Sequence, residues 1–199
     1  MFATIYLPNF YLQAALRYEP QLRTKPVALI EEHERKPIVI QLNAAAEAAG
    51  VRKGMTPSQA LARYLQVAIK VRARVQEKSI AEILLQSAFM LSPFVEATAP
   101  GIATIQFSDI RQSGRRLAVS ADGLTRRGEE SSDRSLSSKV ARIVDRLHKC
   151  EIVAQAGIAP LPDTSFLAAH LARPVLEIDD PKEFLSPLPI ETLTLASTG

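Results

Sequence analysis

The sequence is short of cysteine and of long apolar runs, and both shortages narrow the class of protein. Its 199 residues include a single cysteine, Cys150, so no disulfide can form within the chain. No stretch approaches the roughly 20 apolar residues that cross a bilayer. The opening Met1-Phe2-Ala3 lacks the charged, apolar and small-residue order of a signal peptide. We therefore expect a folded cytoplasmic protein with no membrane partner.

A strong charge of one sign and clustered metal ligands are also missing. The formal net charge is +3, and a mildly basic chain can bind nucleic acid without being committed to it. His33 has no second histidine or cysteine near it in the sequence, so it does not indicate a metal site, and we expect no cofactor. What the chain does have is 47% hydrophobic residues, enough for one sizeable core with or without a small satellite domain.

The clearest local pattern lies in the first third of the chain. Residues 37–42 are rich in β-branched side chains, which favours a buried strand. The alanine-rich residues 44–49 favour a helix, and Gly50 follows where a helix C-terminus accepts a positive φ. Thr56 and Pro57 are typical of the first residues of a second helix. The pattern predicts a strand, a helix, a basic hairpin and a helix.

Strands and helices alternate along the rest of the chain. Alternating and β-branched apolar residues predict strands at 2–7, 26–30, 67–71, 94–97, 102–107 and 152–156. Apolar residues three and four apart predict a helix at 76–91 and one more that Ser135 or Ser137 caps. Two further helices are expected at 10–18 and 163–172, which end before Pro20 and Pro174. Strand 26–30 should form a hairpin with strand 37–42, and strand 94–97 with strand 102–107. The order β-α-β-β-α-β predicts an α/β (α+β) fold of ferredoxin-like type with a small helical insertion.

Residues 43–55 read NAAAEAAGVRKGM and resemble the start of the fingers in the Y-family, the translesion DNA polymerases. The family pattern there is N-Y-x-A-R-x-x-G-V-x-x-G-M. The resemblance implies that Ala44 and Glu47 stand where the family's Tyr and Arg hold the incoming nucleoside triphosphate. A carboxylate at Glu47 would repel a triphosphate, so both positions of the triphosphate site are degenerate.

Three further stretches extend the resemblance over nearly the whole chain. Residues 6–11, YLPNFY, are similar to the family's D-x-D-x-F-[FY], which implies that Tyr6 stands at the first metal-binding Asp. The hairpin motif S-I-D-E aligns so that Gly101 and Ile102 replace the acids that complete the metal site. The turn G-I-[AS]-x-N-K aligns with GIAPLP, in which Pro162 replaces the basic residue that touches the triphosphate.

The resemblance also implies how the chain divides. Residues 184–193 are similar to the family's approach to the thumb, F-L-x-x-L-P-[IV]-x-x-L, and the chain stops where the thumb's helix-hairpin-helix should begin. The implied parts are palm at 1–36, a fingers-like insertion at 37–74, palm again at 75–174, and the truncated start of a thumb at 175–199. We expect an N-terminal palm and fingers fragment of a longer protein.

Nucleotidyl transfer requires acidic side chains that hold two divalent ions at the attacking and leaving oxygens. Tyr6, Gly101 and Ile102 supply no acid, so we predict that the chain is not an enzyme and has no catalytic or metal-binding residue. This loss resembles the ImuB branch of the Y-family, bacterial proteins with a polymerase fold and no polymerase activity. The resemblance implies an adaptor in damage-induced mutagenesis that binds DNA, the sliding clamp, a RecA-like protein and a separate error-prone polymerase.

Two other interpretations are open. The first is an active lesion-bypass polymerase with displaced metal ligands, for which Glu96 and Asp109 lie on the neighbouring strands. The second is a domain that contacts only proteins and has no affinity for DNA, which the modest net charge allows. If the chain binds DNA, we expect Arg52, Lys53 and Arg74 to contact it, because the fingers lie over the template in the family.

Overall fold

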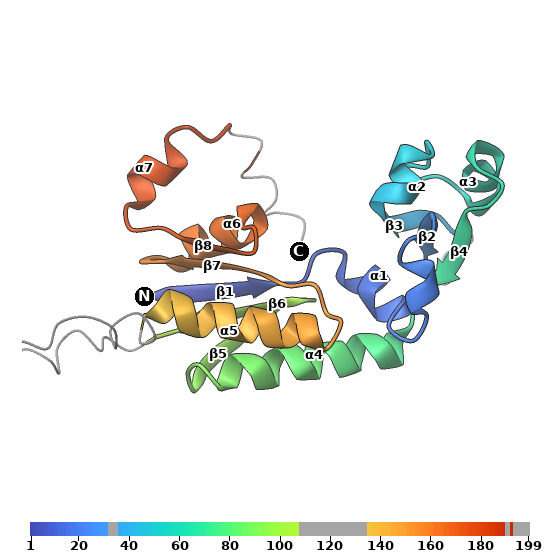
Figure 1. Ribbon diagram of the computed structural model, residues 1–199. Helices are drawn as coiled ribbons and strands as arrows, with labels where there is room; N and C mark the ends of the chain where they lie inside the picture. The colour runs from blue at the N-terminus through green and yellow to red at the C-terminus, as the bar shows by residue number, and fades with distance from the viewer. Residues whose placement is uncertain (32–35, 108–134, 190–191, 193–199) are drawn as a thin grey trace, which may run out of the picture. The chain divides into compact units, whose positions relative to one another are not determined.

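The computed structural model describes residues 1–31, 36–107, 135–189 and 192, which fold into two compact units (Figure 1). The five-stranded unit consists of Met1–Tyr6 and the chain from Leu84 onward, and the three-stranded unit consists of Leu7–Ile83. Each unit has its own sheet and its own helices.

The five-stranded unit is built on a mixed sheet with β1 at its centre. The strands are β1 (Phe2–Tyr6), β5 (Phe94–Ala99), β6 (Ile102–Gln106), β7 (Gln155–Ala159) and β8 (Val175–Glu177). Their order is β5-β6-β1-β7-β8; β1 runs antiparallel to both of its neighbours, and β8 runs parallel to β7. The end of β1, where Tyr6 lies, is therefore flanked by paired strands on both sides.

Helices cover both faces of this sheet (Figure 1). They are α5 (Leu136–Lys149), α6 (Pro162–Leu171), the short α7 (Pro181–Leu185) after β8, and the C-terminal end of α4 (Arg74–Phe89). Successive residues of a strand point to opposite faces. Thr4 is hydrogen-bonded to Ser165 of α6, so its neighbours Ala3 and Ile5, which are fully buried, face the layer of α4 and α5.

α6 lies against β7 at Gly157, where there is no room for a side chain. A Cβ at this position would lie 2.2 Å from the backbone oxygen of Ser165 and 2.3 Å from the backbone nitrogen of Ala169. The glycine therefore allows the backbones of the helix and the strand to approach each other closely. This approach places the side chains of α6 directly over β1.

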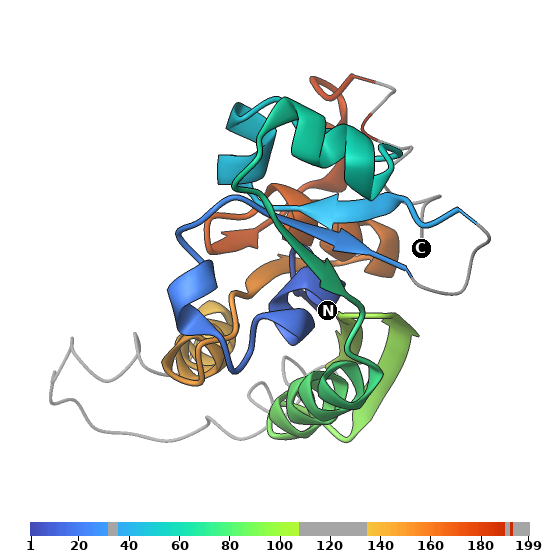
Figure 2. The same cartoon turned by 90° about the vertical axis from the view of Figure 1, so that its right-hand side faces the viewer.

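The three-stranded unit is a small sheet between helices (Figure 2). Its strands are β2 (Val27–Ile30), β3 (Val39–Leu42) and β4 (Ala68–Val71), and its helices are α1 (Phe10–Ala15), the single 3₁₀ turn η1 (Pro20–Leu22), α2 (Ala44–Ala48) and α3 (Pro57–Arg63). β2 is central, antiparallel to β3 and parallel to β4. Ala46 of α2 and Ala60 of α3 pack with Ala28 on one face, whereas Leu12 of α1 packs with Val27 on the other.

The predicted fold class is confirmed, because the chain is an α/β (α+β) protein with strands and helices in the expected order. Both predicted hairpins form, β2 with β3 and β5 with β6. Ser135 caps α5 by accepting a hydrogen bond from the amide of Ser138 at 3.1 Å, and Thr56 and Gln59 form a reciprocal cap at α3. The division into palm, fingers and thumb stays a prediction.

The last long strand begins later than predicted. The sequence predicts a strand at 152–156, whereas β7 is Gln155–Ala159. The amide of Ile152 donates to the carbonyl oxygen of Leu147 at 3.0 Å, so this residue closes the end of α5 and does not enter the sheet. Within the described residues, no helix is long and apolar enough to cross a membrane.

Candidate functional site

Three aromatic rings meet where β1 ends beneath α6. The ring of Tyr6 stacks on the imidazole of His170, with centroids 4.0 Å apart and planes inclined by 22°. Phe166 lies on the same helix one turn earlier, with its centroid 4.5 Å from that of His170. The Nδ1 atom of His170 is 2.9 Å from the carbonyl oxygen of Phe166. The helix turn and the stack together fix the imidazole between two rings.

Burial shifts the pKa of both titratable rings in the stack toward the neutral form. Burial lowers the pKa of His170, although the hydrogen bond to the carbonyl of Phe166 acts in the opposite direction. Burial raises the pKa of the Tyr6 hydroxyl. Both shifts favour the uncharged side chain at the end of β1.

A row of hydroxyl groups crosses the sheet beside this stack. Thr98 of β5 donates to Thr104 of β6 at 2.7 Å, and Thr104 lies 3.5 Å from Thr4 of β1. Thr4 is bonded to Ser165 of α6 at 2.8 Å, and Ser165 donates to the carbonyl oxygen of Pro162 at 2.7 Å. Thr4 and Ser165 are fully buried, so the row ties β1 to the first turn of α6.

A cavity of about 580 Å³ opens at the exposed end of this row. Glu96, Thr98 and Thr104 come from the sheet, and the first two turns of α6 supply the rest of its lining: Pro162, Asp163, Phe166 and Leu167. Two carboxylates, two hydroxyls and one aromatic face thus share one space of the size that small-molecule sites occupy. The sequence directed attention to Glu96 but missed Asp163, whose only signal was an acid directly after Pro162.

The structure brings together the residues that the resemblance assigned to the metal site. Tyr6 and Ile102 lie directly opposite each other in the pairing of β1 with β6, and Gly101 occupies the turn before β6 with a φ of 77°. They do not fit a divalent ion, because Ile102 is buried and apolar, Gly101 has no side chain, and the Tyr6 ring is held in the stack. Asp109 lies outside the described residues, among which no group of three or more metal-ligating side chains occurs.

The positions assigned to the triphosphate lie in both units. Ala44 and Glu47 are exposed one turn apart on α2 of the three-stranded unit, and Pro162 is the first residue of α6 in the five-stranded unit. The α2 positions are fixed by Asn43, whose side-chain oxygen accepts hydrogen bonds from the amides of Ala46 and Val27 at 3.0 and 3.1 Å. The asparagine of the fingers pattern therefore caps α2 and also anchors β2.

The three cations predicted to contact DNA differ in what they already bind. The Nη1 atom of Arg52 donates to the carbonyl oxygens of Glu47 at 2.6 Å and of Val51 at 2.8 Å, so this guanidinium caps the C-terminal end of α2. Arg74 forms an ion pair with Glu31 at 3.0 Å. Lys53 is exposed in residues 50–55, the tight turn between α2 and α3 that corresponds to the predicted basic hairpin.

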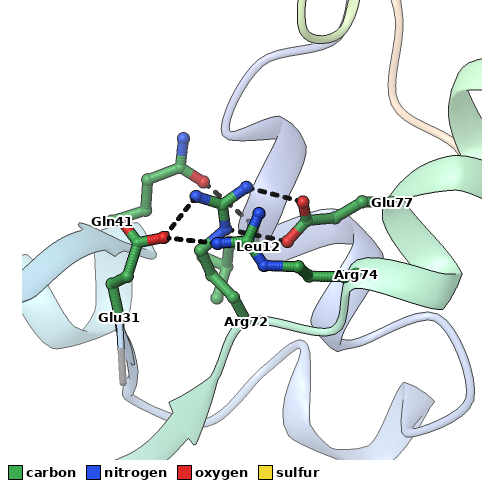
Figure 3. Close-up of polar contacts among 6 residues, drawn as sticks. All are labelled: Leu12, Glu31, Gln41, Arg72, Arg74 and Glu77. Carbon is green, nitrogen blue, oxygen red and sulfur yellow. Dashed lines mark hydrogen bonds and ion pairs between the residues drawn. The ribbon is translucent and has the colours of Figure 1, made fainter. Parts of the chain in front are cut away.

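A cluster of charges that the sequence did not indicate surrounds Arg72 (Figure 3). Its guanidinium binds both carboxylate oxygens of Glu77 at 2.9 and 2.7 Å and one oxygen of Glu31 at 2.7 Å. It also lies 3.9 Å from the centroid of the Tyr11 ring. The hydrogen bond with Glu77 raises the pKa of Arg72 further above its ordinary value, against the effect of burial. This cluster joins the end of β4 and the start of α4 to β2 and α1.

Comparison with known proteins identifies relatives for both units. The model of the impB/mucB/samB family matches residues 5–170. DNA polymerase IV of Pseudomonas syringae pv. tomato is 27% identical over 190 residues, which cover 92% of this chain and 48% of the relative. The chain therefore spans about half the length of the curated relatives it matches.

The likeness extends to solved structures at the level of the fold. DinB from Sulfolobus solfataricus superposes with a TM-score of 0.73 at 16% identity, covering 96% of this chain and 52% of that chain. An insertion ternary complex of Dbh DNA polymerase superposes with a TM-score of 0.74, also at 16% identity, covering 96% of this chain and 53% of that chain.

One prediction from the sequence is overturned by these findings. We predicted that the chain is not an enzyme, whereas its curated relatives are named DNA polymerase IV and a structure of its fold is a polymerase complex. The prediction rested on the missing acids at Tyr6, Gly101 and Ile102, together with the substituted triphosphate positions Ala44, Glu47 and Pro162. Metal chemistry depends on whichever carboxylates a fold brings together, and not only on the positions that align with a motif.

Proposed function

This chain belongs to the impB/mucB/samB family, and from that membership we propose that it serves DNA damage bypass as a DNA-binding domain of the Y-family polymerase type. The observation that carries the proposal is the continuity of the family match, which runs from β1 through the whole three-stranded unit to α6. A match of that extent includes both units.

We propose that the hairpin after α2 provides one contact with the phosphate backbone. Lys53 is exposed there, and Gly50 and Gly54 on either side adopt φ values of 87° and 83° that shape the turn. Arg52 holds the hairpin against α2 through two carbonyl oxygens, so we assign it a positioning role in addition to any phosphate contact. Arg74 is a weaker candidate, because binding of a phosphate would compete with Glu31.

The test is the binding of a primer–template duplex by the whole protein, measured by fluorescence anisotropy over a series of salt concentrations. We expect Lys53→Gln to weaken binding for every sequence and to reduce the slope of log K against log salt by about one. Lys182→Gln, on the exposed face of α7, is the matched control. If the two variants bind DNA equally tightly and with the same salt dependence, the hairpin is not part of the DNA interface. Failure of the unaltered protein to bind at low salt would refute DNA binding and favour a domain that contacts only proteins.

Nucleotidyl transfer by the whole protein is a second proposal, which the names of the curated relatives support. The residues at Tyr6, Gly101 and Ile102 do not fit the divalent ions of the family. Glu96 and Asp163 are the carboxylates that share a cavity on the same sheet face as Tyr6. Primer extension with Mg²⁺ or Mn²⁺ tests this proposal. If Glu96→Gln and Asp163→Asn abolish primer extension, the result would support these carboxylates as displaced metal ligands. If both variants retain extension, neither residue is a metal ligand.

We also propose an ImuB-like adaptor role, which the substitutions at Tyr6, Ala44 and Glu47 support. In this role the whole protein holds the sliding clamp, a RecA-like protein and a separate error-prone polymerase at the lesion. Such an assembly is compatible with nucleotidyl transfer by the same protein. Size-exclusion chromatography of the whole protein with each purified partner tests it, and no change of elution with any of the three would refute the adaptor role.

A further inference from the structure

The outer face of α5 carries a straight row of cations. Lys139, Arg142, Arg146 and Lys149 are spaced by three, four and three residues, which places them on one side of a helix, and all four are exposed. The row is about 15 Å long at 1.5 Å per residue. The opposite side of α5 is apolar and faces the sheet: Val140, Ile143, Val144 and Leu147.

Helix stability does not account for the whole row. Cations in the last turn of a helix interact favourably with its macrodipole, which suits Arg146 and Lys149. Lys139 lies near the N-terminal end, where the same dipole disfavours a cation. Asp145 is the one carboxylate within α5, against the four cations of the row. Binding of an anionic partner therefore explains the row better than the stability of the helix does.

Two exposed apolar side chains adjoin the row. Met90 is 61% exposed and Phe89 is 55% exposed at the end of α4. The Nη1 atom of Arg146 lies 3.1 Å from the sulfur of Met90, so the cation row reaches the C-terminal end of α4. We call the four cations of α5, Phe89 at the end of α4 and Met90 directly after it the basic–apolar surface. Adjacent exposed Phe and Met side chains are typical of protein interfaces, in which Arg is also enriched.

We propose that the basic–apolar surface docks an acidic amphipathic helix of a partner protein. Carboxylates one turn apart on such a helix would face the cation row, and an apolar side chain beside them would cover Met90 and Phe89. About ten residues of helix match the length of the row. A DNA backbone matches the charge, but it offers no apolar group to cover the two exposed side chains, so a protein partner fits the surface better. This surface belongs to the five-stranded unit, whereas the hairpin proposed to bind DNA belongs to the three-stranded unit.

The test uses the whole protein and three labelled probes in anisotropy measurements. The probes are a synthetic acidic amphipathic helix, a polyglutamate peptide of equal charge, and a DNA duplex. We expect the amphipathic helix to bind about tenfold more tightly than polyglutamate, a difference of about 1.4 kcal/mol. Lys139→Glu/Lys149→Glu should weaken its binding by about tenfold or more, because each substitution replaces an attraction by a repulsion. Lys78→Glu/Lys182→Glu, which reverses two exposed lysines elsewhere, is the matched control.

Met90→Ser tests the apolar part without changing the charge, and it should weaken binding of the amphipathic helix but not of polyglutamate. Two results would overturn the proposal. Equal binding of both peptides with no effect of Met90→Ser would mean that the row is only a charged surface. Loss of duplex binding in Lys139→Glu/Lys149→Glu, with peptide binding intact, would make the row a nucleic-acid site. Circular dichroism checks that each variant is folded, and Lys139→Gln/Lys149→Gln replaces the double reversal if it is not.

Discussion

The ring of Tyr6 stacks on the imidazole of His170 at a centroid distance of 4.0 Å, across 164 positions of the sequence. Tyr6 ends the central strand of the five-stranded sheet, and His170 lies in the last turn of the helix that covers it. The stack fills the place at which the resemblance puts the first acid of the family. The same ring therefore stabilises this unit and leaves no acid at the position where the family binds metal.

Stability should fall at mildly acidic pH because His170 must stay neutral in the stack. Its pKa is lowered by burial below the ordinary value of 6.5, so the unfolded chain binds more protons in the window between the two values. The contribution is fully present above about pH 6.5 and is lost as the pH falls toward the lowered pKa. Urea unfolding at pH values on both sides of this window measures it. In His170→Phe the loss of stability on acidification should be smaller, and an unchanged loss would contradict the assignment.

The ring of Tyr6, more than its hydroxyl, should hold the end of β1. We expect Tyr6→Leu to lower the free energy of unfolding by about 2 kcal/mol, through lost buried area and a lost aromatic pair. Tyr6→Phe keeps the ring and serves as the control, with an expected change within about 0.5 kcal/mol. Denaturant unfolding of the two variants decides the point. Equal destabilisation would show that the hydroxyl contributes as much as the stack.

The sequence was sufficient for features that depend on neighbours along the chain. Ser135, one of the two serines predicted to cap α5, is its cap, and the apolar stripe of α5 is buried. Thr56 and Gln59 lie within one helical turn, so their reciprocal cap also follows from local order. Such features need only the period of a helix and the hydrogen-bonding capacity of its first residues.

Contacts between distant segments were not predictable in the same way. Nothing in the local pattern pairs Tyr6 with His170, or Glu96 with Asp163, because these pairs depend on which strands become neighbours in the sheet. The start of β7 was misplaced for a related reason, since Ile152 is as apolar as a strand residue but is used to end α5. The polar tie from Arg72 to Glu31 likewise depends on the parallel pairing of β4 with β2.

Removing one member of the Arg72 and Glu77 pair should cost more than removing both. Glu77 is 8% exposed and binds the guanidinium through both carboxylate oxygens. Glu77→Leu would leave Arg72 with one carboxylate partner fewer in a largely buried place, at a cost of about 3 kcal/mol. Arg72→Met/Glu77→Leu should recover part of that loss, because the uncompensated charge is gone. A double-mutant cycle of urea unfolding measures the coupling, and strict additivity of the two single changes would contradict it.

Gly157 should be the least tolerant glycine of the five-stranded unit's described residues, because backbone atoms occupy the space of a side chain. In Gly157→Ala the new Cβ would lie within 2.3 Å of two backbone atoms of α6, which cannot move aside as a flexible side chain could. We expect α6 to shift away from β7, with a loss of about 3 kcal/mol or more in the free energy of unfolding. The Tyr6 and His170 rings should separate with it, which the chemical shifts of the imidazole protons would report. Gly54→Ala is the matched control, since its Cβ would meet nothing within 4 Å and only the φ of 83° disfavours it, by about 1 kcal/mol. A smaller loss for Gly157→Ala than for Gly54→Ala would mean that α6 is free to move over the sheet, and the stack could then not be a fixed feature of the site.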